Sequence, residues 1–481
     1  MTSVTRDDKS AAPSGRRRPH WAWAVAGVSL LVLISSSGFR ALPGVTMDPM
    51  HDHEGWSHSE ISFAVSVNLV IFALTAPFAA ALMMRYGIGR TVAASLALIA
   101  VGSGLPARAA SAWQLTVYWG LLVGLGSGAL AVAFVTTLTQ RWFHRRRGLV
   151  TGVLTAGGTA GQLVFLPLLA WLVEATGWRA ASLVVAAAAL ATAPLALWLI
   201  RDDPRELGLR PYGADDLSSD ELSAMTADEL GAEPSGALRA LAQAARTSTF
   251  WLLAGGFAIC GVTTAGMIQT HFVPAAGDHG MPGTTAAGLL ALAGVFDIVG
   301  TTLSGFLTDR VDSRVLLGAF YTLRGISLFF LPSLFSDSPT PSLLVFTVFY
   351  GLDWIATVPP MIRLCQDHFG ADAAIVFGWM WTAHQLGGAA AAAAGGVIRD
   401  YLGAYTIAWY GSAVLCLLAA ASSLAIRTRQ QTSTSAATAR SADRGMTGSA
   451  PAIRRSPSGA GTGAGRGKLC RSLRRGFRGS G

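Results

Sequence analysis

Charge is scarce in this sequence. Only 13% of its 481 residues are Asp, Glu, Lys or Arg, whereas 52% are hydrophobic. Soluble globular proteins carry about 25% charged residues, and half that share cannot cover the surface of a water-soluble protein of this size. A lipid bilayer accepts an apolar exterior. The composition therefore excludes a soluble enzyme and a disordered protein, and it indicates a membrane protein.

The sequence also lacks the motifs of common enzyme and metal chemistry. It has no P-loop G-x-x-x-x-G-K-[ST], no H-E-x-x-H and no dinucleotide fingerprint. Its four cysteines are scattered, without the spacing of a metal site or a disulfide framework. We therefore expect no enzyme activity, no cofactor and no metal site. Because the ATP-binding motif is absent, any transport must be driven by a gradient.

Long apolar runs dominate the sequence, each about as long as the 20 residues that a helix needs to cross a bilayer. The runs are continuous, whereas the strands of an outer-membrane barrel alternate apolar and polar residues. The pattern predicts an all-α polytopic membrane protein with twelve transmembrane helices in two pseudo-symmetric six-helix halves. The twelve runs lie at 21–45, 61–83, 91–110, 113–139, 148–173, 179–200, 250–273, 285–307, 314–334, 342–362, 373–398 and 404–426.

These runs divide the chain into five parts. We expect a cytoplasmic N-terminal tail (1–20), a first half (21–200), a cytoplasmic central loop (201–249), a second half (250–426) and a basic C-terminal tail (427–481). The C-terminal tail is rich in Ser, Ala, Gly and Arg and has no apolar period, so we expect it to be disordered.

The distribution of arginine sets the expected orientation. With the N-terminus inside, the loops between runs hold fourteen arginines on the inside and four on the outside. Positive charge favours the cytoplasmic side, so both termini are expected in the cytoplasm. The net charge of +9 lies in these loops and tails, so we expect no nucleic-acid partner. Arginine outnumbers lysine 34 to 2, which is typical of a GC-rich genome, and we expect the cytoplasmic membrane of a bacterium.

Two loops repeat each other 225 residues apart. The first, after the second run, reads "MMRYGIGR", and the second, after the eighth run, reads "SGFLTDRVDSR". Matched loops in two six-span halves are the layout of a parallel-repeat transporter, in which the halves rock about a midplane site. We expect the loops to gate this motion, with Asp309 and Arg310 pairing across neighbouring helices in one conformation. The gating residues predicted are Arg85, Gly87, Arg90, Gly305, Asp309 and Arg310.

On these motifs the chain resembles the major facilitator superfamily, whose loop pattern G-x-L-x-D-R stands here as "GFLTDR". Met84 occupies the acidic position in the first half. The stretch "RWFHRRRGLVTGVLTAGGTAGQLVFLPLL" from Arg141, with "GLDWIATVPP" in the tenth run, is similar to the monocarboxylate porter and oxalate/formate antiporter group. This resemblance covers about residues 25–426, and it implies the superfamily fold and secondary transport.

Ionisable residues inside an apolar run are costly and therefore candidates for function. Arg40, about one turn from the outer end of the first run, could hold a carboxylate in a bidentate grip or extend to the outer headgroups. Asp297 lies in the middle of the eighth run. The resemblance implies proton coupling at Asp297, although the arginine expected one turn later is Thr301 here. A structural ion pair with Arg324 or Arg40 is the alternative for Asp297.

Five further polar residues lie in the second half. His384 and Gln385, in the eleventh run, are candidates for substrate binding, and a histidine would make that binding sensitive to pH. A hydrogen-bonded packing role is the alternative. His271, before Pro274 where the helix is expected to end or unwind, is a candidate for substrate binding at the outer mouth. We expect Arg324 and Asp353 to form a structural ion pair within the second half.

The leading hypothesis is a secondary active transporter that moves a small, monocarboxylate-like organic anion by alternating access, either with protons or in exchange for another anion. The alternatives are proton-coupled efflux of a drug-like or metabolite compound, and a membrane sensor that does not transport. The expected partners are the organic anion, protons and the lipid bilayer, and we expect a monomer.

Overall fold

The computed structural model describes residues 20–130, 132–214 and 234–427. Two parts of the prediction lie outside these residues. They are the acidic middle of the central loop and the two tails, 1–20 and 427–481, of which only residues 20 and 427 are described. Within them the chain is helical, and the one extended pairing is an isolated bridge between Phe143 and Tyr212.

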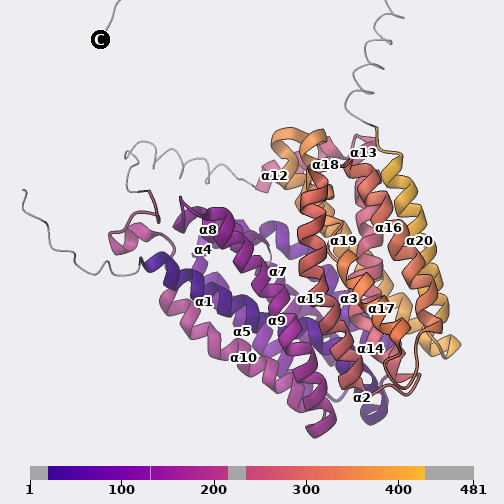
Figure 1. Cartoon of the computed structure of the whole chain (residues 1–481). Helices are drawn as coiled ribbons and strands as arrows, with labels where there is room; N and C mark the ends of the chain where they lie inside the picture. The colour runs from indigo at the N-terminus through magenta and orange to yellow at the C-terminus, as the bar shows by residue number, and fades with distance from the viewer. Residues whose placement is uncertain (1–19, 131, 215–233, 428–481) are drawn as a thin grey trace, which may run out of the picture. The chain divides into compact units, whose positions relative to one another are not determined.

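Six membrane-spanning segments form the first half (Figure 1). Several are built from two or more consecutive helices, so we number them as spans. The six spans are span 1, α1 (Trp21–Ser36) and α2 (Gly38–Glu54); span 2, α3 (His58–Thr75), η1 (Ala76–Phe78) and α4 (Ala79–Tyr86); span 3, α5 (Ile88–Gly104) and η2 (Leu105–Arg108); span 4, α6 (Ala112–Leu115), the π-helical η3 (Thr116–Val123), α7 (Gly124–Ala129) and α8 (Val132–Trp142); span 5, α9 (Arg147–Thr176); and span 6, α10 (Trp178–Leu199).

The second half repeats this order, after the short helices η4 (Pro204–Leu207) and α12 (Pro234–Ala244) of the central loop. Its six spans are span 7, α13 (Ser248–Gly261), the π-helical η5 (Val262–Ile268) and α14 (Gln269–Gly277); span 8, α15 (Gly283–Thr308); span 9, α16 (Ser313–Phe330) and η6 (Leu331–Ser333); span 10, α17 (Pro341–Asp353) and α18 (Val358–Phe369), followed by η7 (Gly370–Asp372); span 11, α19 (Ala373–Leu402); and span 12, α20 (Thr406–Leu424).

Eleven of these segments are both long and apolar enough to cross a membrane within the described part of the chain. The twelfth, α19, is 30 residues long. It carries the adjacent polar residues His384 and Gln385 together with several glycines, so it is less apolar than its neighbours. With α19 included, the twelve spans and the all-α fold that the sequence predicts are confirmed.

Glycines bring span 4 close to span 2. Three glycines of span 4 face α3, and a Cβ atom added at any one of them would lie 3.0 Å from a backbone carbonyl oxygen of that helix. The glycines are Gly120, Gly124 and Gly128, and the facing carbonyls are those of Ala64, Asn68 and Phe72. Such close backbone approach is how small residues hold helices together in lipid.

The halves meet along a few pairs of helices. From the first half, α3 packs against α19, α9 against α15, and α2 against α14.

The spans run alternately between two ends of the molecule. We call one the arginine end, formed by the loops at 86–88, 142–147, 308–313 and 369–373 and by the central loop. We call the other the acidic end, formed by the loops at 54–58, 108–112, 176–178, 277–283, 333–341 and 402–406.

Candidate functional site

A central cavity of about 140 Å³ lies between the halves. An engineered cavity of roughly 150 Å³ holds benzene, so this space suits a small molecule. The lining comes from spans 1, 2, 4 and 5 of the first half and from spans 7, 8, 10 and 11 of the second. Most of the lining surface is apolar, and the charged and amide side chains in it are Arg40, Asn68, Gln162, Gln269, Asp297, His384 and Gln385.

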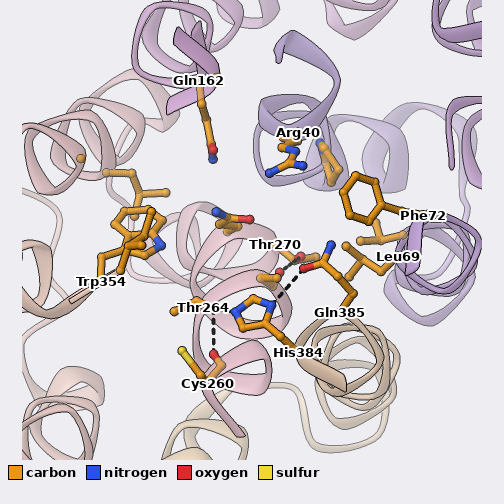
Figure 2. Close-up of a pocket in the computed structure, with 18 of the residues that line it drawn as sticks. Arg40, Leu69, Phe72, Gln162, Cys260, Thr264, Thr270, Trp354, His384 and Gln385 are labelled. Carbon is orange, nitrogen blue, oxygen red and sulfur yellow. Dashed lines mark hydrogen bonds between the residues drawn. The ribbon is translucent and has the colours of Figure 1, made fainter. Parts of the chain in front are cut away.

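Arg40 contributes a cation to this cavity from α2. Its guanidinium lies over the ring of Phe72, 5.2 Å from the centroid, and faces His384 and Gln385 across the cavity (Figure 2). Among the described residues it has no hydrogen-bond acceptor and no acidic partner. The sequence placed Arg40 about one turn from the end of its span, and that is wrong. Helix α2 continues through two prolines to Glu54, so the end of the span lies about 21 Å beyond Arg40 at 1.5 Å per residue.

Asp297 lines the cavity from α15 and is 3% exposed. One carboxylate oxygen, Oδ1, accepts a hydrogen bond from the Thr301 hydroxyl at 3.0 Å and another from the backbone N–H of Ile355 at 2.9 Å. Ile355 lies where span 10 is interrupted between α17 and α18, so its N–H has no helical acceptor. Asp297 thus ties span 8 to this interruption. Neither Arg324 nor Arg40 forms an ion pair with it.

Arg324 and Asp353 are brought together as a buried pair. Nε of Arg324 lies 2.6 Å from Oδ2 of Asp353, with side-chain exposures of 0% and 6%. The guanidinium also donates to the carbonyl oxygens of Asp353 and Trp354, at 2.6 and 3.0 Å, and it lies 3.0 Å from the Cys260 sulfur. This pair therefore joins spans 7, 9 and 10, and Arg324 is not in the cavity lining.

His384 and Gln385 line the cavity from α19 and are both buried. The His384 ring lies between the side chains of Gln385 and Thr264, which are within hydrogen-bonding distance of its two nitrogens (Figure 2). The structure thus gathers Arg40, Asp297, His384 and Gln385 around one space, although they come from three spans of the chain.

His271 is not part of this cavity, and its predicted place at a mouth is wrong. The residue is fully buried, its Nε2 lies 2.9 Å from the carbonyl oxygen of Ala392, and its ring packs 5.0 Å from that of Tyr405. The expected helix end at Pro274 is also wrong, because α14 continues to Gly277. The irregular backbone lies earlier in this span, in the π-helical η5, and Pro274 is accommodated inside α14.

The predicted gating loop of the first half lies at the arginine end. Gly87 has φ of +91°, and a Cβ there would collide with the carboxylate of Asp202. Asp202 accepts hydrogen bonds from the N–H groups of Ile88 and Gly89 and so caps α5. Arg85 lies over the ring of Tyr86, and Arg90 is exposed.

In the second half, Asp309 ends α15 and makes no ion pair with another described residue. Arg310 turns back to its own helix, donating to the carbonyl of Phe306 at 3.2 Å, and Gly305 has open space beside it. The pairing of Asp309 and Arg310 across helices is therefore not seen in this conformation. Asp312 caps α16 instead, and its hydrogen bonds with Arg314 hold the pKa of that carboxyl below its usual value.

Two carboxylates at the acidic end connect the halves, and the sequence analysis missed both. Asp400 of α19 accepts hydrogen bonds from the N–H groups of His58 and Ser59, at 3.1 and 2.8 Å, and so caps α3. Glu174 of α9 accepts one from the N–H of Thr284 at 2.8 Å and caps α15. Each carboxylate therefore lies at the N-terminus of a helix in the other half, where negative charge is favoured.

A sequence signal for these caps exists. Ser59 and Thr284 are separated by 225 residues, the same interval as the repeated loops, and Glu174 and Asp400 by 226. Toward the arginine end, the described residues show one long hydrogen bond between the halves, from the Thr382 hydroxyl to the carbonyl of Ala73 at 3.5 Å.

Comparisons with known proteins agree with this architecture. The model of the Major Facilitator Superfamily matches residues 29–392. Human monocarboxylate transporter 11 is 26% identical over 416 residues, which cover 84% of this chain and 83% of that protein. Monocarboxylate transporter 13 of Bos taurus is 29% identical over 353 residues, which cover 72% of this chain and 76% of that protein. An uncharacterized MFS-type transporter of Bacillus subtilis is 23% identical, with coverage of 82% and 92%.

Solved structures share the fold at low identity. The xylose transporter XylE from E. coli, in an inward open conformation, aligns with a TM-score of 0.63 and 15% identity over 84% of this chain and 95% of that one. A bacterial homologue of the human lysosomal transporter Spinster, inward-facing and occupied, aligns with a TM-score of 0.63 and 16% identity, covering 84% and 96%. With the family model matching well over half of its length, this multi-pass membrane protein belongs to the Major Facilitator Superfamily.

Proposed function

We propose that the chain is a secondary active transporter for a small organic anion of the monocarboxylate type. The observation that carries the proposal is Arg40, a guanidinium inside the membrane region that faces a cavity and has no acid or carbonyl partner among the described residues. An unpaired buried cation is costly, and an anion in the cavity would compensate it. A guanidinium presents a planar fork of donors that matches a carboxylate.

The rest of the cavity supports the same substrate class. Phe39, Phe72, Trp354 and Trp381 provide apolar walls for a short hydrocarbon body. Amide side chains offer donors and acceptors for a polar group, as is usual in small-molecule sites. The space is small, and the named relatives are monocarboxylate transporters.

Alternating access would follow from closure at one end at a time. We place the arginine end in the cytoplasm of a bacterium, because positive loops favour that side. The two carboxylate caps then close the outer end, and the cavity would open toward the cytoplasm. The coupled ion is a proton or a second anion, and the titratable candidates in the cavity lining are Asp297 and His384.

A thermal-shift screen of the detergent-purified protein tests the proposal. The panel contains mono- and dicarboxylates, sugars, amino acids and cationic drugs, each at acidic and at neutral pH. A ligand that binds only the folded state stabilises it by RT ln(1 + [L]/Kd), about 2.7 kcal/mol at a hundredfold excess over Kd. We expect carboxylates to raise the melting temperature of the parent protein and to have no effect on Arg40→Gln.

The matched control is Arg179→Gln, which removes an arginine from the acidic end where it pairs with Glu54 at 2.6 Å. This variant should keep the carboxylate shift. Uptake of the active carboxylate into proteoliposomes then separates a transporter from a sensor, since a sensor binds without flux. Shifts from cationic drugs alone would reject the anion proposal in favour of efflux.

A further inference from the structure

The ring of His384 is held by hydrogen bonds on both sides. Its Nδ1 lies 2.9 Å from Oε1 of Gln385, and its Nε2 lies 3.1 Å from the hydroxyl of Thr264. The same hydroxyl lies 2.7 Å from the carbonyl oxygen of Cys260 (Figure 2). His384 is only 8% exposed and lines the cavity.

These contacts fix one proton on the ring and leave the other nitrogen adjustable. Oε1 of Gln385 can only accept, so Nδ1 must carry hydrogen. When the ring is neutral, the Thr264 hydroxyl donates to Nε2. When the ring is protonated, Nε2–H donates to the Thr264 oxygen, and the hydroxyl hydrogen turns to the Cys260 carbonyl. His384 can therefore gain or lose a proton at Nε2 through the rotation of one hydroxyl, with no heavy atom displaced.

The ring faces suit a cation. The indole of Trp381 stacks on the His384 ring with centroids 5.2 Å apart and planes 8° apart. Phe257 approaches the same ring at 5.0 Å. A cation within about 6 Å of an aromatic face is attracted by the ring, so these rings stabilise an imidazolium without an acidic partner.

The surrounding charges leave room for an anion. No described carboxylate is within hydrogen-bonding distance of the His384 ring. Cys260 of α13 lies beside the His384 ring, and on its other side is the ion pair of Arg324 and Asp353. Asp297 of span 8 and Arg40 of span 1 line the same cavity as His384. A protonated His384 and Arg40 together exceed the single acid, Asp297, in the lining. An incoming anion restores the balance and so favours the protonated ring, and by linkage protonation favours the anion.

Gln385 connects the ring to the ligand. With its oxygen held by Nδ1–H, its amide nitrogen is the end left to donate, and Gln385 lines the cavity. Asp297 differs, because the hydrogen bonds that its Oδ1 accepts from the Ile355 N–H and the Thr301 hydroxyl favour the charged carboxylate. We propose that His384 is the residue that takes up the coupled proton, with Thr264 and Gln385 as its positioning residues. This deepens the proposed function, and the part concerning anion transport rests on it.

The first test needs no ligand. A protonated imidazole stacked on an indole quenches its fluorescence, so the emission of Trp381 reports the charge of His384. Subtracting the emission of Trp381→Phe from that of the parent isolates this indole. We expect the difference to fall in a one-proton transition as the pH is lowered, and the transition to vanish in His384→Gln. A transition that persists in His384→Gln, or that is missing in the parent, overturns the proposal even if anion transport is proven.

The second test measures coupling in proteoliposomes, with radiolabelled L-lactate as the probe. An inward gradient of one pH unit is worth about 1.36 kcal/mol, or about tenfold accumulation for one coupled proton. We expect this accumulation of lactate in the parent and none in His384→Gln, whatever the rate of lactate uptake in each protein. If accumulation survives in His384→Gln and is lost in Asp297→Asn, Asp297 carries the proton and the proposal is wrong. If the parent does not carry lactate, the fluorescence test still decides the charge of His384.

The positioning role has its own signature. Thr264→Val removes the rotating hydroxyl, so we expect the fluorescence transition to move to lower pH, because a protonated Nε2 loses its acceptor. Thr264→Ser restores the hydroxyl and should restore the transition. A Thr264→Val titration identical to that of the parent contradicts the hydroxyl mechanism.

Discussion

The two halves hold their intramembrane charge in different ways. In the second half, Arg324 is bonded to Asp353 and to two carbonyl groups and is out of contact with the cavity. In the first half, Arg40 faces the cavity and lies over the ring of Phe72, with no hydrogen bond or ion pair from its side chain to another described residue. The comparison separates a charge that belongs to the fold from a charge that is available to a ligand. Composition alone does not separate them, because both are arginines inside apolar runs.

The largest expected effect is on the buried pair. Arg324→Leu leaves the carboxylate of Asp353 buried without its partner, and breaking such a pair costs about 3–5 kcal/mol. We expect a large fall in the melting temperature in detergent. The double variant Arg324→Leu with Asp353→Leu should recover part of the loss, because no unpaired charge remains. A double variant as unstable as the single one would mean that the carbonyl contacts of Arg324, and not the ion pair, hold this half together.

Arg40 should show the opposite behaviour. Arg40→Gln removes a cation that the described residues leave unpaired, so the stability of the ligand-free protein should be unchanged or higher. Binding of the carboxylate identified by the thermal-shift screen should weaken roughly 10- to 100-fold, since hydrogen bonds to a charged group contribute about 1.5–3 kcal/mol. Arg40→Lys keeps the charge but loses the planar set of donors, so its affinity for the carboxylate should lie between those of the parent and Arg40→Gln. Calorimetric titration measures the affinities, and destabilisation by Arg40→Gln without loss of affinity would erase the contrast with Arg324.

The caps at the acidic end give an intermediate effect. Glu174→Gln with Asp400→Asn keeps the acceptors but removes their charge, and each is worth about 1 kcal/mol at a helix N-terminus. Positions 53 and 401 are exposed at this end in opposite halves. Spin labels attached there should show, in the double variant, a larger population of molecules with a long distance between the labels than in the parent. A Cys470→Ser background restricts labelling, since the other cysteines are buried.

Glu60→Gln is the matched control for the caps. This acid lies at the same helix end as Asp400, but it caps α3 from within its own half. We expect the distance distribution of this variant to match that of the parent. If it shifts as much as the double variant does, the effect is local fraying of α3 and not separation of the halves.

The smallest effect is expected from an exposed pair within the second half. Arg363 and Asp367 are one turn apart on α18 with 3.3 Å between charged atoms, and both are about half exposed. Pairs of this kind contribute about 0.3–0.5 kcal/mol. Arg363→Ala should therefore leave the melting temperature nearly unchanged, which shows that burial and not pairing makes Arg324 important.

The sequence predicts the fold well because scarce charge and continuous apolar runs leave few alternatives to a bundle of spanning helices. Span ends are predicted less well. Helix α2 extends to Glu54 through Pro43 and Pro49, since α9, α10 and α14 pack against it and most of its residues as far as Met50 are buried, so that local signals for a helix end are overridden. The grouping of Arg40, Asp297 and His384 around one cavity agrees with their cost in lipid, which confines ionisable residues to the interior of the bundle.

The remaining site features depend on distant contacts. His271 satisfies the same sequence criterion as His384, but the carbonyl of Ala392, 121 residues away, holds its ring outside the cavity. Glu174 and Asp400 look like ordinary acids at helix ends. Only the packing of one half on the other shows which N-terminus each of them caps, so an analysis of single helices does not find them.

The receiving side of each cap has a consequence for how the protein tolerates mutation. The donors at positions 59 and 284 are backbone N–H groups, which nineteen of the twenty amino acids supply equally. Most substitutions at these two positions therefore keep the backbone part of each cap, although at position 59 the serine hydroxyl also contacts Asp400. Proline is the single exception, because it has no N–H yet is accepted in the first turn of a helix. A proline at position 284 would remove the hydrogen bond that Glu174 accepts while leaving the helix, its charge and the acid in place. A proline at position 59 would leave Asp400 the bond from the N–H of His58.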